Sequence, residues 1–260
     1  MKPTLLVVLL LGGLIVPGFA LDRLDQWAPA IWTQTLATPK SSVSMILTKE
    51  GSGKFKESIA QTTYTSNPDG TYTRDYSGPD EVSHSLFLQN GRLQKCVADN
   101  SKDQKVYSVM LSSDQHNASF LTEMKGKKPS SITRIMGAEH IIMPEYVNLI
   151  RQAWQHGIRG GFAFKGLAPD GSMEIDMETR LIETNAPWKA SDKYEIPSAF
   201  MSAFPDSQKY VVADFNLSGM FSFLYKFHNY WIFKITPEGL EFAGSFGGDP
   251  KKAVFTFMSE

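Results

Sequence analysis

The residues that could carry acid–base or metal chemistry are spread thinly along the chain. The five histidines, at positions 84, 116, 140, 156 and 228, each stand alone, and Glu139–His140 is the only adjacent pair of a carboxylate and an imidazole. Metal ligands from one segment are usually separated by two or more residues, so this pair is a poor metal motif. The sequence has no Gly-x-Ser-x-Gly elbow and no His-Glu-x-x-His helix. Local motifs therefore predict no catalytic residue and no metal site.

Two further patterns resemble chemical motifs and have simpler interpretations. Glu174, Asp176 and Glu178 share one side of an alternating stretch, as carboxylates on a solvated strand face do. The stretch "GSGK" at 51–54 lacks the spacing and the following Ser or Thr of a phosphate-binding loop, and we interpret it as a turn. No cofactor is predicted. Cys96, the single cysteine, is expected to be a small buried apolar residue.

The strongest candidate for binding chemistry is the aromatic stretch "MFSFLYKFHNYWIFKI" at 220–235. Aromatic residues recur at every second position, which predicts two strands with a turn at His228–Asn229, and Trp231, Phe233 and Ile235 on one face of the return strand. Charged residues within the stretch argue against a membrane-spanning helix. The stretch is therefore either the wall of a pocket for an apolar ligand or part of the hydrophobic core.

Helices are expected at two places that could cover this aromatic face. Residues 22–37 place apolar side chains at roughly helical spacing, and "PEYVNLIRQAWQHG" at 144–157 has Pro at its first turn and Gly at its end. Val147, Ile150 and Trp154 form an apolar stripe along the second helix. The predicted ligand-binding residues are Phe221, Phe223, Tyr225, Phe227, Trp231, Phe233, Val147, Ile150 and Trp154.

The remaining sequence reads as strands joined by short turns. "NPDG" at 67–70, Asn90–Gly91 and "PDG" at 169–171 are turn signals between alternating stretches, and a short helical turn is expected near 197–204. We predict an α+β fold, with a large, curved, half-barrel-like antiparallel sheet of about ten to twelve strands and helices packed on one face. A closed barrel and two packed sheets are the alternatives. Residues 21–260 are expected to form one domain, whose two sub-halves would meet near 126–144.

The N-terminus predicts export. A charged start at Lys2, an apolar run from Leu5 to Val16 and small residues at Gly18 and Ala20 form a secretory signal peptide over residues 1–20. The apolar run is short for a membrane span, so no transmembrane segment is expected in the mature chain. A secreted chain that cannot form an internal disulfide fits the periplasm of a Gram-negative bacterium, or secretion otherwise.

Composition limits the partners. A formal net charge of −1 and 20% charged residues give no basic surface for nucleic acid. The 17 Phe and 11 Met residues supply large and adaptable apolar surface, which suits a hydrophobic small molecule or lipid. Lys125, Lys127 and Lys128 lie in a connector, and we interpret them as a solvated loop or as a contact for an acidic partner or lipid head group.

The layout resembles that of the periplasmic LolA/LppX-like half-barrel carriers of lipoproteins and lipids. The resemblance rests on the helix "PEYVNLIRQAWQHG", the turns "NPDG", "QNGR" and "APDG", and the aromatic strands after Leu217, and it extends over most of residues 22–260. It implies that a concave apolar face holds acyl chains beneath the helices. No individual binding residue carries over, because none of these stretches is a family motif.

Three functions therefore remain open. The first is an envelope binding or carrier protein that encloses a hydrophobic ligand between sheet and helices. The second is a non-catalytic assembly or structural protein of the cell envelope, with a protein partner at the 125–128 connector or at an open sheet edge. The third is a hydrolase whose active site is assembled from distant residues.

Overall fold

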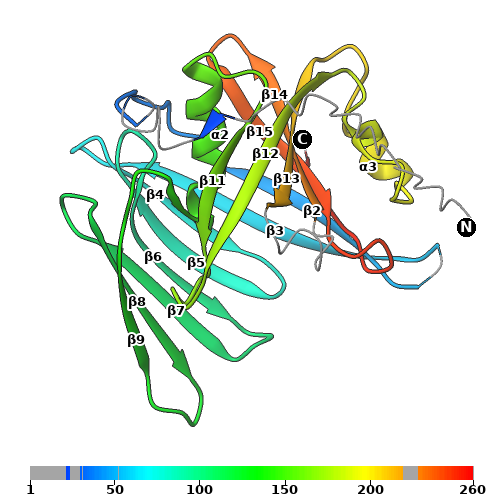
Figure 1. The fold of residues 1–260 in the computed structure, drawn as a ribbon. Coiled ribbons are helices and arrows are strands. Elements are labelled where there is room, and N and C mark those ends of the chain that lie inside the picture. Colours follow the sequence, from blue (N-terminus) through cyan, green and yellow to red (C-terminus); the bar gives the residue numbers. More distant parts are fainter. Residues whose placement is uncertain (1–21, 24–29, 31, 52, 219–227, 260) are drawn as a thin grey trace, which may run out of the picture.

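The computed structural model describes residues 22–23, 30, 32–51, 53–218 and 228–259. Nearly all of the regular structure is one large curved sheet (Figure 1). The first half of the chain contributes β1 (Asp22–Arg23), β2 (Ser42–Lys49), β3 (Phe55–Ser66), β4 (Tyr72–Ser77), β5 (Glu81–Phe87), β6 (Leu93–Asn100), β7 (Lys105–Leu111), β8 (Asn117–Met124) and β9 (Ser130–Ile135).

The second half of the chain contributes the other strands and most of the described helical structure. Its strands are β10 (His140–Ile142), β11 (Phe162–Leu167), β12 (Glu174–Thr184), β13 (Tyr210–Leu217), β14 (His228–Thr236), β15 (Gly239–Gly247) and β16 (Val254–Ser259). The helices are α2 (Tyr146–Gln155), α3 (Ser198–Ser202) and the 3-10 turns η1 (Met143–Glu145) and η2 (Pro187–Ala190). None of the helices in the described ranges is long and apolar enough to cross a membrane.

The strand order shows how the two halves join. It runs β1-β11-β12-β13-β14-β15-β16-β2-β3-β4-β5-β6-β7-β8-β9, and β10 also pairs with β11. Neighbouring strands are antiparallel, except that β1 and β10 lie parallel to β11 along one of its edges. The C-terminal strand β16 pairs with β2, and this pairing joins the strands of the two halves of the chain in the middle of the sheet.

Strand alternation gives the sheet two distinct faces. We call the face that packs against α2 the inner face and the opposite one the outer face. On β14, Trp231 and Phe233 pack on the inner face with the α2 cluster, whereas Tyr230 and Ile232 pack on the outer face with Phe200 of α3. The two helices accordingly lie on opposite sides of β13–β15 (Figure 1). Burial on both faces explains why this part of the sequence is so rich in aromatic residues.

The sheet curves back toward itself without closing. β9 ends one side of the strand order, and no described strand pairs with its free edge. Arg134 of β9 instead donates hydrogen bonds from Nε to the Gly171 carbonyl at 2.7 Å and from Nη2 to the Ser172 carbonyl at 2.8 Å, in the β11–β12 turn. The ring of Phe120 lies where a Cβ of Gly171 would be, so this close approach requires glycine. Side-chain contacts therefore hold the two ends of the sheet together here.

The predicted fold class is right about the sheet and wrong about the helices. A large, curved, mainly antiparallel sheet is confirmed. The described residues form sixteen strands, more than the predicted ten to twelve. The fold they show is mostly β rather than α+β, and α2 and α3 do not share one face. The sequence estimate missed short strands such as β1 and β10, whose two and three residues are too few to show a period.

The predicted N-terminal helix over 22–37 is wrong at both of its ends. Asp22–Arg23 form β1 and a turn follows at 32–34, whereas Ala30 is helical and residues 24–29 and 31 lie outside the described residues. The Leu36 amide donates to the Gln89 carbonyl at 3.0 Å, and the Asn90 side chain donates to the Trp32 carbonyl at 2.6 Å. In residues 32–36, hydrogen bonds to the β5–β6 turn thus take the place of the hydrogen bonds of a helix.

The turn predicted at His228–Asn229 is wrong, because both residues belong to β14 and pair with Asn216 and Phe215 of β13. The inner-face alignment of Trp231, Phe233 and Ile235 is confirmed.

The turns at 67–70, 90–91 and 169–171 and the helix within 144–157 are confirmed as well. The proposed signal peptide and residues 219–227 lie outside the described residues.

Replacing Gly91 by Ala is expected to destabilise the protein more than replacing Gly126 by Ala. Both glycines have positive φ, +86° and +79°, which costs any other residue about 1–2 kcal/mol. Only at Gly91 would the new Cβ also lie 2.8 Å from Asn148 Cβ and Leu36 Cδ1, and such overpacking adds about 1–3 kcal/mol. Urea unfolding of both variants checks this. Equal losses would show that the contact between the β5–β6 turn and α2 is loose.

Candidate functional site

The inner face is organised around Glu145, which lies where η1 passes into α2 and is completely buried. Its carboxylate accepts hydrogen bonds from the amides of Leu93, at 2.8 Å, and Ile142, at 2.9 Å. Arg92 Nε lies 3.3 Å from the same carboxylate. An uncompensated buried carboxylate would be strongly unfavourable, so these donors explain how a charge is accommodated in the core. They also fix the start of α2 against the β5–β6 hairpin.

Arg92 is buried as well, and its charge is fully accommodated. Besides Glu145, it donates from Nη1 to the His140 carbonyl at 3.2 Å, and its guanidinium lies 4.8 Å from the ring centre of Trp32. Asn148 and Gln152 of α2 donate to the Gly91 and Asn90 carbonyls at 2.9 and 2.7 Å. One side of α2 is therefore bonded to the hairpin turn, and its apolar stripe is left to face β13–β15.

The described members of the predicted binding set all lie in one cluster under α2. Ile150 and Phe233 have 0% exposure, and Val147, Trp154 and Trp231 are partly buried against the same residues. Tyr146 stacks on Phe215 with ring centres 5.5 Å apart and meets Trp231 at 6.1 Å. This end of the inner face is well packed. Phe221, Phe223, Tyr225 and Phe227 lie outside the described residues, and a ligand-binding role for the whole set stays a prediction.

Farther from α2, the inner face of β3–β7 is less well covered. Tyr72, Phe87 and Leu93 lie close to α2 and are buried at 1% exposure or less. At the other end of the same strands, Tyr76, Ala98 and Tyr107 are only partly buried. The strand register places all of these side chains on the same face. The inner face therefore changes from a filled core beneath α2 to a partly open aromatic wall.

On this inner face, several buried polar atoms have no hydrogen-bond partner among the described residues. They are Tyr72 Oη, Arg74 Nε, Ser83 Oγ and, from α2, Arg151 Nη1. Asn148 faces the Tyr72 hydroxyl without meeting hydrogen-bond geometry. Desolvation raises the pKa of both Tyr64 and Tyr72, and the Arg74 and Arg151 guanidiniums oppose this shift. The two phenols therefore stay neutral hydrogen-bond donors.

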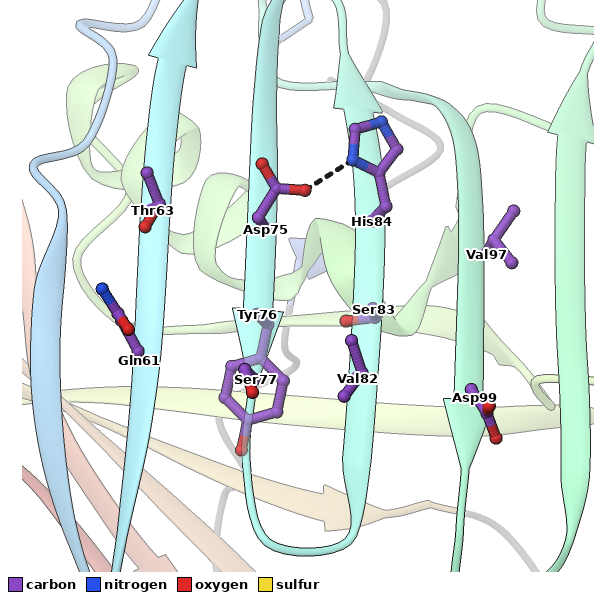
Figure 2. Close-up of a pocket in the computed structure, with 10 residues that line it drawn as sticks. All are labelled: Gln61, Thr63, Asp75, Tyr76, Ser77, Val82, Ser83, His84, Val97 and Asp99. Carbon is purple, nitrogen blue, oxygen red and sulfur yellow. Dashed lines mark hydrogen bonds and ion pairs between the residues drawn. The ribbon is translucent and has the colours of Figure 1, made fainter.

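A separate hollow of about 440 Å³ lies on the outer face of β3–β6 (Figure 2). Asp75 and His84 meet there across neighbouring strands, with Oδ1 and Nδ1 2.6 Å apart, and both side chains are 55% exposed. The residues directly opposite His84 are Asp75 and Val97, so no hydroxyl stands directly across from the imidazole. The pair resembles part of a catalytic triad without a nucleophile in place.

His140 and Glu174 form a third polar cluster, which joins β10 to β11 and β12. The Gly137 amide donates to His140 Nδ1 at 2.7 Å, so Nε2 carries the proton that bonds Glu174 at 2.8 Å. Lys165 donates to the other Glu174 oxygen at 2.6 Å. The hydrogen bond from Lys165, with a smaller one from His140, holds the pKa of Glu174 below its usual value. Both imidazole nitrogens are occupied, and the described residues contain no metal-binding group of three His, Cys, Asp or Glu residues.

The sequence analysis missed the polar part of the inner wall. Tyr72, Arg74 and Tyr76 alternate in "TYTRDYS", which predicts that an arginine shares a strand face with two aromatic residues. That alternation was the available signal. What it could not reveal is that this face turns inward and that Arg151 approaches it from another element.

The comparisons with known proteins provide a fold-level likeness only. No known family and no curated protein matches the sequence. The chain is similar to a solved structure described as a beta-barrel-like protein of domain of unknown function DUF1849 from Brucella abortus, with 7% sequence identity and a TM-score of 0.49. The similarity covers 87% of this chain and 98% of that one. A likeness this distant carries no functional argument, and the resemblance to half-barrel carriers stays a prediction.

Replacing Glu145 by Gln is expected to reduce the free energy of unfolding by about 3–5 kcal/mol, because it leaves the buried Arg92 charge without its counterion. Replacing both residues, Glu145→Gln with Arg92→Met, should recover a large part of that loss. A double-mutant cycle by urea unfolding measures the coupling. A loss below about 1 kcal/mol for Glu145→Gln would contradict the central role given to this carboxylate.

Proposed function

We propose that this chain is a non-catalytic binding or carrier protein that holds a hydrophobic ligand of the lipid or acyl type on the inner face of its sheet. The observation that carries the proposal is the partly covered wall of Tyr76, Ala98 and Tyr107 beyond the packed core. In a protein with only a structural role, a curved sheet of this size would be expected to fill its inner face with its own side chains.

Binding would be driven by burial of apolar surface. Each ligand methylene removed from water contributes roughly 0.8 kcal/mol, so an acyl chain against the aromatic wall gains several kcal/mol. α2 is bonded to the β5–β6 turn on one side and packed on β13–β15 on the other. We therefore propose that the ligand enters from the end of the inner face farther from α2, without displacement of the helix.

Ligand binding is tested with the purified chain, extracted with organic solvent and then titrated with N-phenyl-1-naphthylamine. We expect fluorescence enhancement that dodecanoate or 1-dodecanol reverses. The informative pair of variants is Ala98→Trp and Val97→Trp, which add the same side chain at adjacent positions on the inner and outer faces. Filling the inner wall should weaken binding at least tenfold, whereas Val97→Trp should leave it unchanged.

Circular dichroism and thermal unfolding identify variants that fail to fold, and Ala98→Leu provides a milder change for that case. Absence of binding by the unmodified chain would overturn the proposal and favour an envelope interaction protein. Equal effects of the two Trp variants would place the ligand elsewhere.

We also propose that the chain is exported to the periplasm, in accord with the signal at residues 1–20. Intact-mass analysis of the protein expressed with its N-terminus in a Gram-negative host is expected to give a chain beginning at Leu21, recovered from the periplasmic fraction. A full-length mass that begins at Met1 would contradict cleavage after Ala20.

A further inference from the structure

We propose that Arg74 and Arg151, with the Tyr72 hydroxyl, form a site for the anionic oxygens of an amphipathic ligand, a carboxylate or a phosphate at the head of its apolar chain. This inference rests on the proposed binding function and specifies the chemistry of the ligand. It also assigns the ligand an orientation, with its head group toward α2 and its chain along the aromatic wall.

Arg74 provides the first observation. It lies in the middle of β4 on the inner face, opposite Tyr64 of β3 and Ser85 of β5. Its Nε is buried without a partner, and no carboxylate of the described residues forms an ion pair with it. A guanidinium remains charged at any physiological pH, and burying its Nε–H without an acceptor is costly. Arg92, by contrast, is satisfied on the same face by Glu145 and the His140 carbonyl.

Arg151 provides the second observation from a different element. It donates from Nε to the Leu240 carbonyl at 3.1 Å and from Nη2 to the Ala37 carbonyl at 2.6 Å. These two bonds fix the orientation of the guanidinium, while the third nitrogen, Nη1, is buried with no partner among the described residues. Glu241 supplies the carboxylate charge that acts on Arg151. The Glu241 side chain is 44% exposed, and its Oε1 lies 3.8 Å from Lys40 Nζ. Arg151 thus presents a nitrogen, Nη1, whose hydrogens meet no acceptor among the described residues.

Arg74 and Arg151 both approach the pair of tyrosines Tyr64 and Tyr72. Arg74 pairs directly with Tyr64 across β3 and β4, and the rings of Tyr64 and Tyr72 have centres 6.3 Å apart. The positive charges of both arginines oppose the rise that burial causes in the pKa of these two tyrosines. Tyr72 is 1% exposed, and its hydroxyl is unpartnered. Since burial keeps both phenols neutral, they add donors without adding negative charge. Two cations and a neutral hydroxyl with unused donors match an anionic oxygen group, which accepts several charge-assisted hydrogen bonds.

The test compares probes with the same chain and different head groups: dodecanoate, dodecyl phosphate and neutral 1-dodecanol, each displacing N-phenyl-1-naphthylamine. We expect the two anions to bind at least tenfold more tightly than the alcohol, and only their affinity to fall with added sodium chloride. Arg74→Gln should weaken anion binding by about tenfold to a hundredfold and leave 1-dodecanol unchanged. Arg180→Gln, an exposed arginine of β12 on the outer face, is the matched control.

Tyr72→Phe is the second site variant, since it removes only the hydroxyl, and should weaken anion binding by a smaller factor. Competition by inorganic phosphate alone distinguishes a site for free anions from one that requires the attached chain. Equal affinity for the anions and the alcohol, or equal weakening of all three by Arg74→Gln, would overturn the inference and leave the proposed function standing. If no probe binds, the proposed function fails and the inference fails with it.

Discussion

The structure depends on one buried carboxylate. Glu145 sits at the start of α2 and accepts hydrogen bonds from the Leu93 and Ile142 amides while facing Arg92. A charge in the core is tolerated only where such partners surround it, so α2 has one position in which Glu145 is stable. That position sets the helix across the inner face, between the β5–β6 turn and strands β13–β15. The inner face is a packed core where α2 covers it and a partly open wall where α2 does not reach.

The division of the inner face is a consequence of helix length. α2 has ten residues, which span about 15 Å, and it is bonded to one end of the hairpin strands. Side chains near that end, such as Phe87 and Leu93, are buried by it, whereas Ala98 and Tyr107 farther along are not. The outer face is covered differently, since α3 and Phe204 pack with side chains of β13–β16, of β2 and of the start of β3. Each helix therefore leaves a different part of the sheet uncovered.

The charges on the inner face fall into two kinds. Arg92 and Glu145 form an ion pair with each other, and their role is structural. Arg74 and Arg151 leave donors unused at the border between the packed and the open regions. Because unpaired buried donors are uncommon in folded proteins, their position at this border supports a ligand head group there more strongly than aromatic content alone. The outer hollow with Asp75 and His84 is exposed, and its exposed ion pair calls for no such partner.

The sequence by itself determined the longer strands, the turns at 67–70, 90–91 and 169–171 and helix α2, because alternation, turn residues and a helical stripe are properties of neighbouring residues. It also determined that Trp231 and Phe233 share a face. Only the tertiary structure decided which face points inward, that the helices lie on opposite sides, and that the ends of the sheet meet at Arg134 and Gly171. The juxtaposition of Arg74 with Arg151, like that of Glu145 with Arg92, joins residues far apart in the chain. No local pattern encodes such a pairing, because it follows from the order in which the strands assemble.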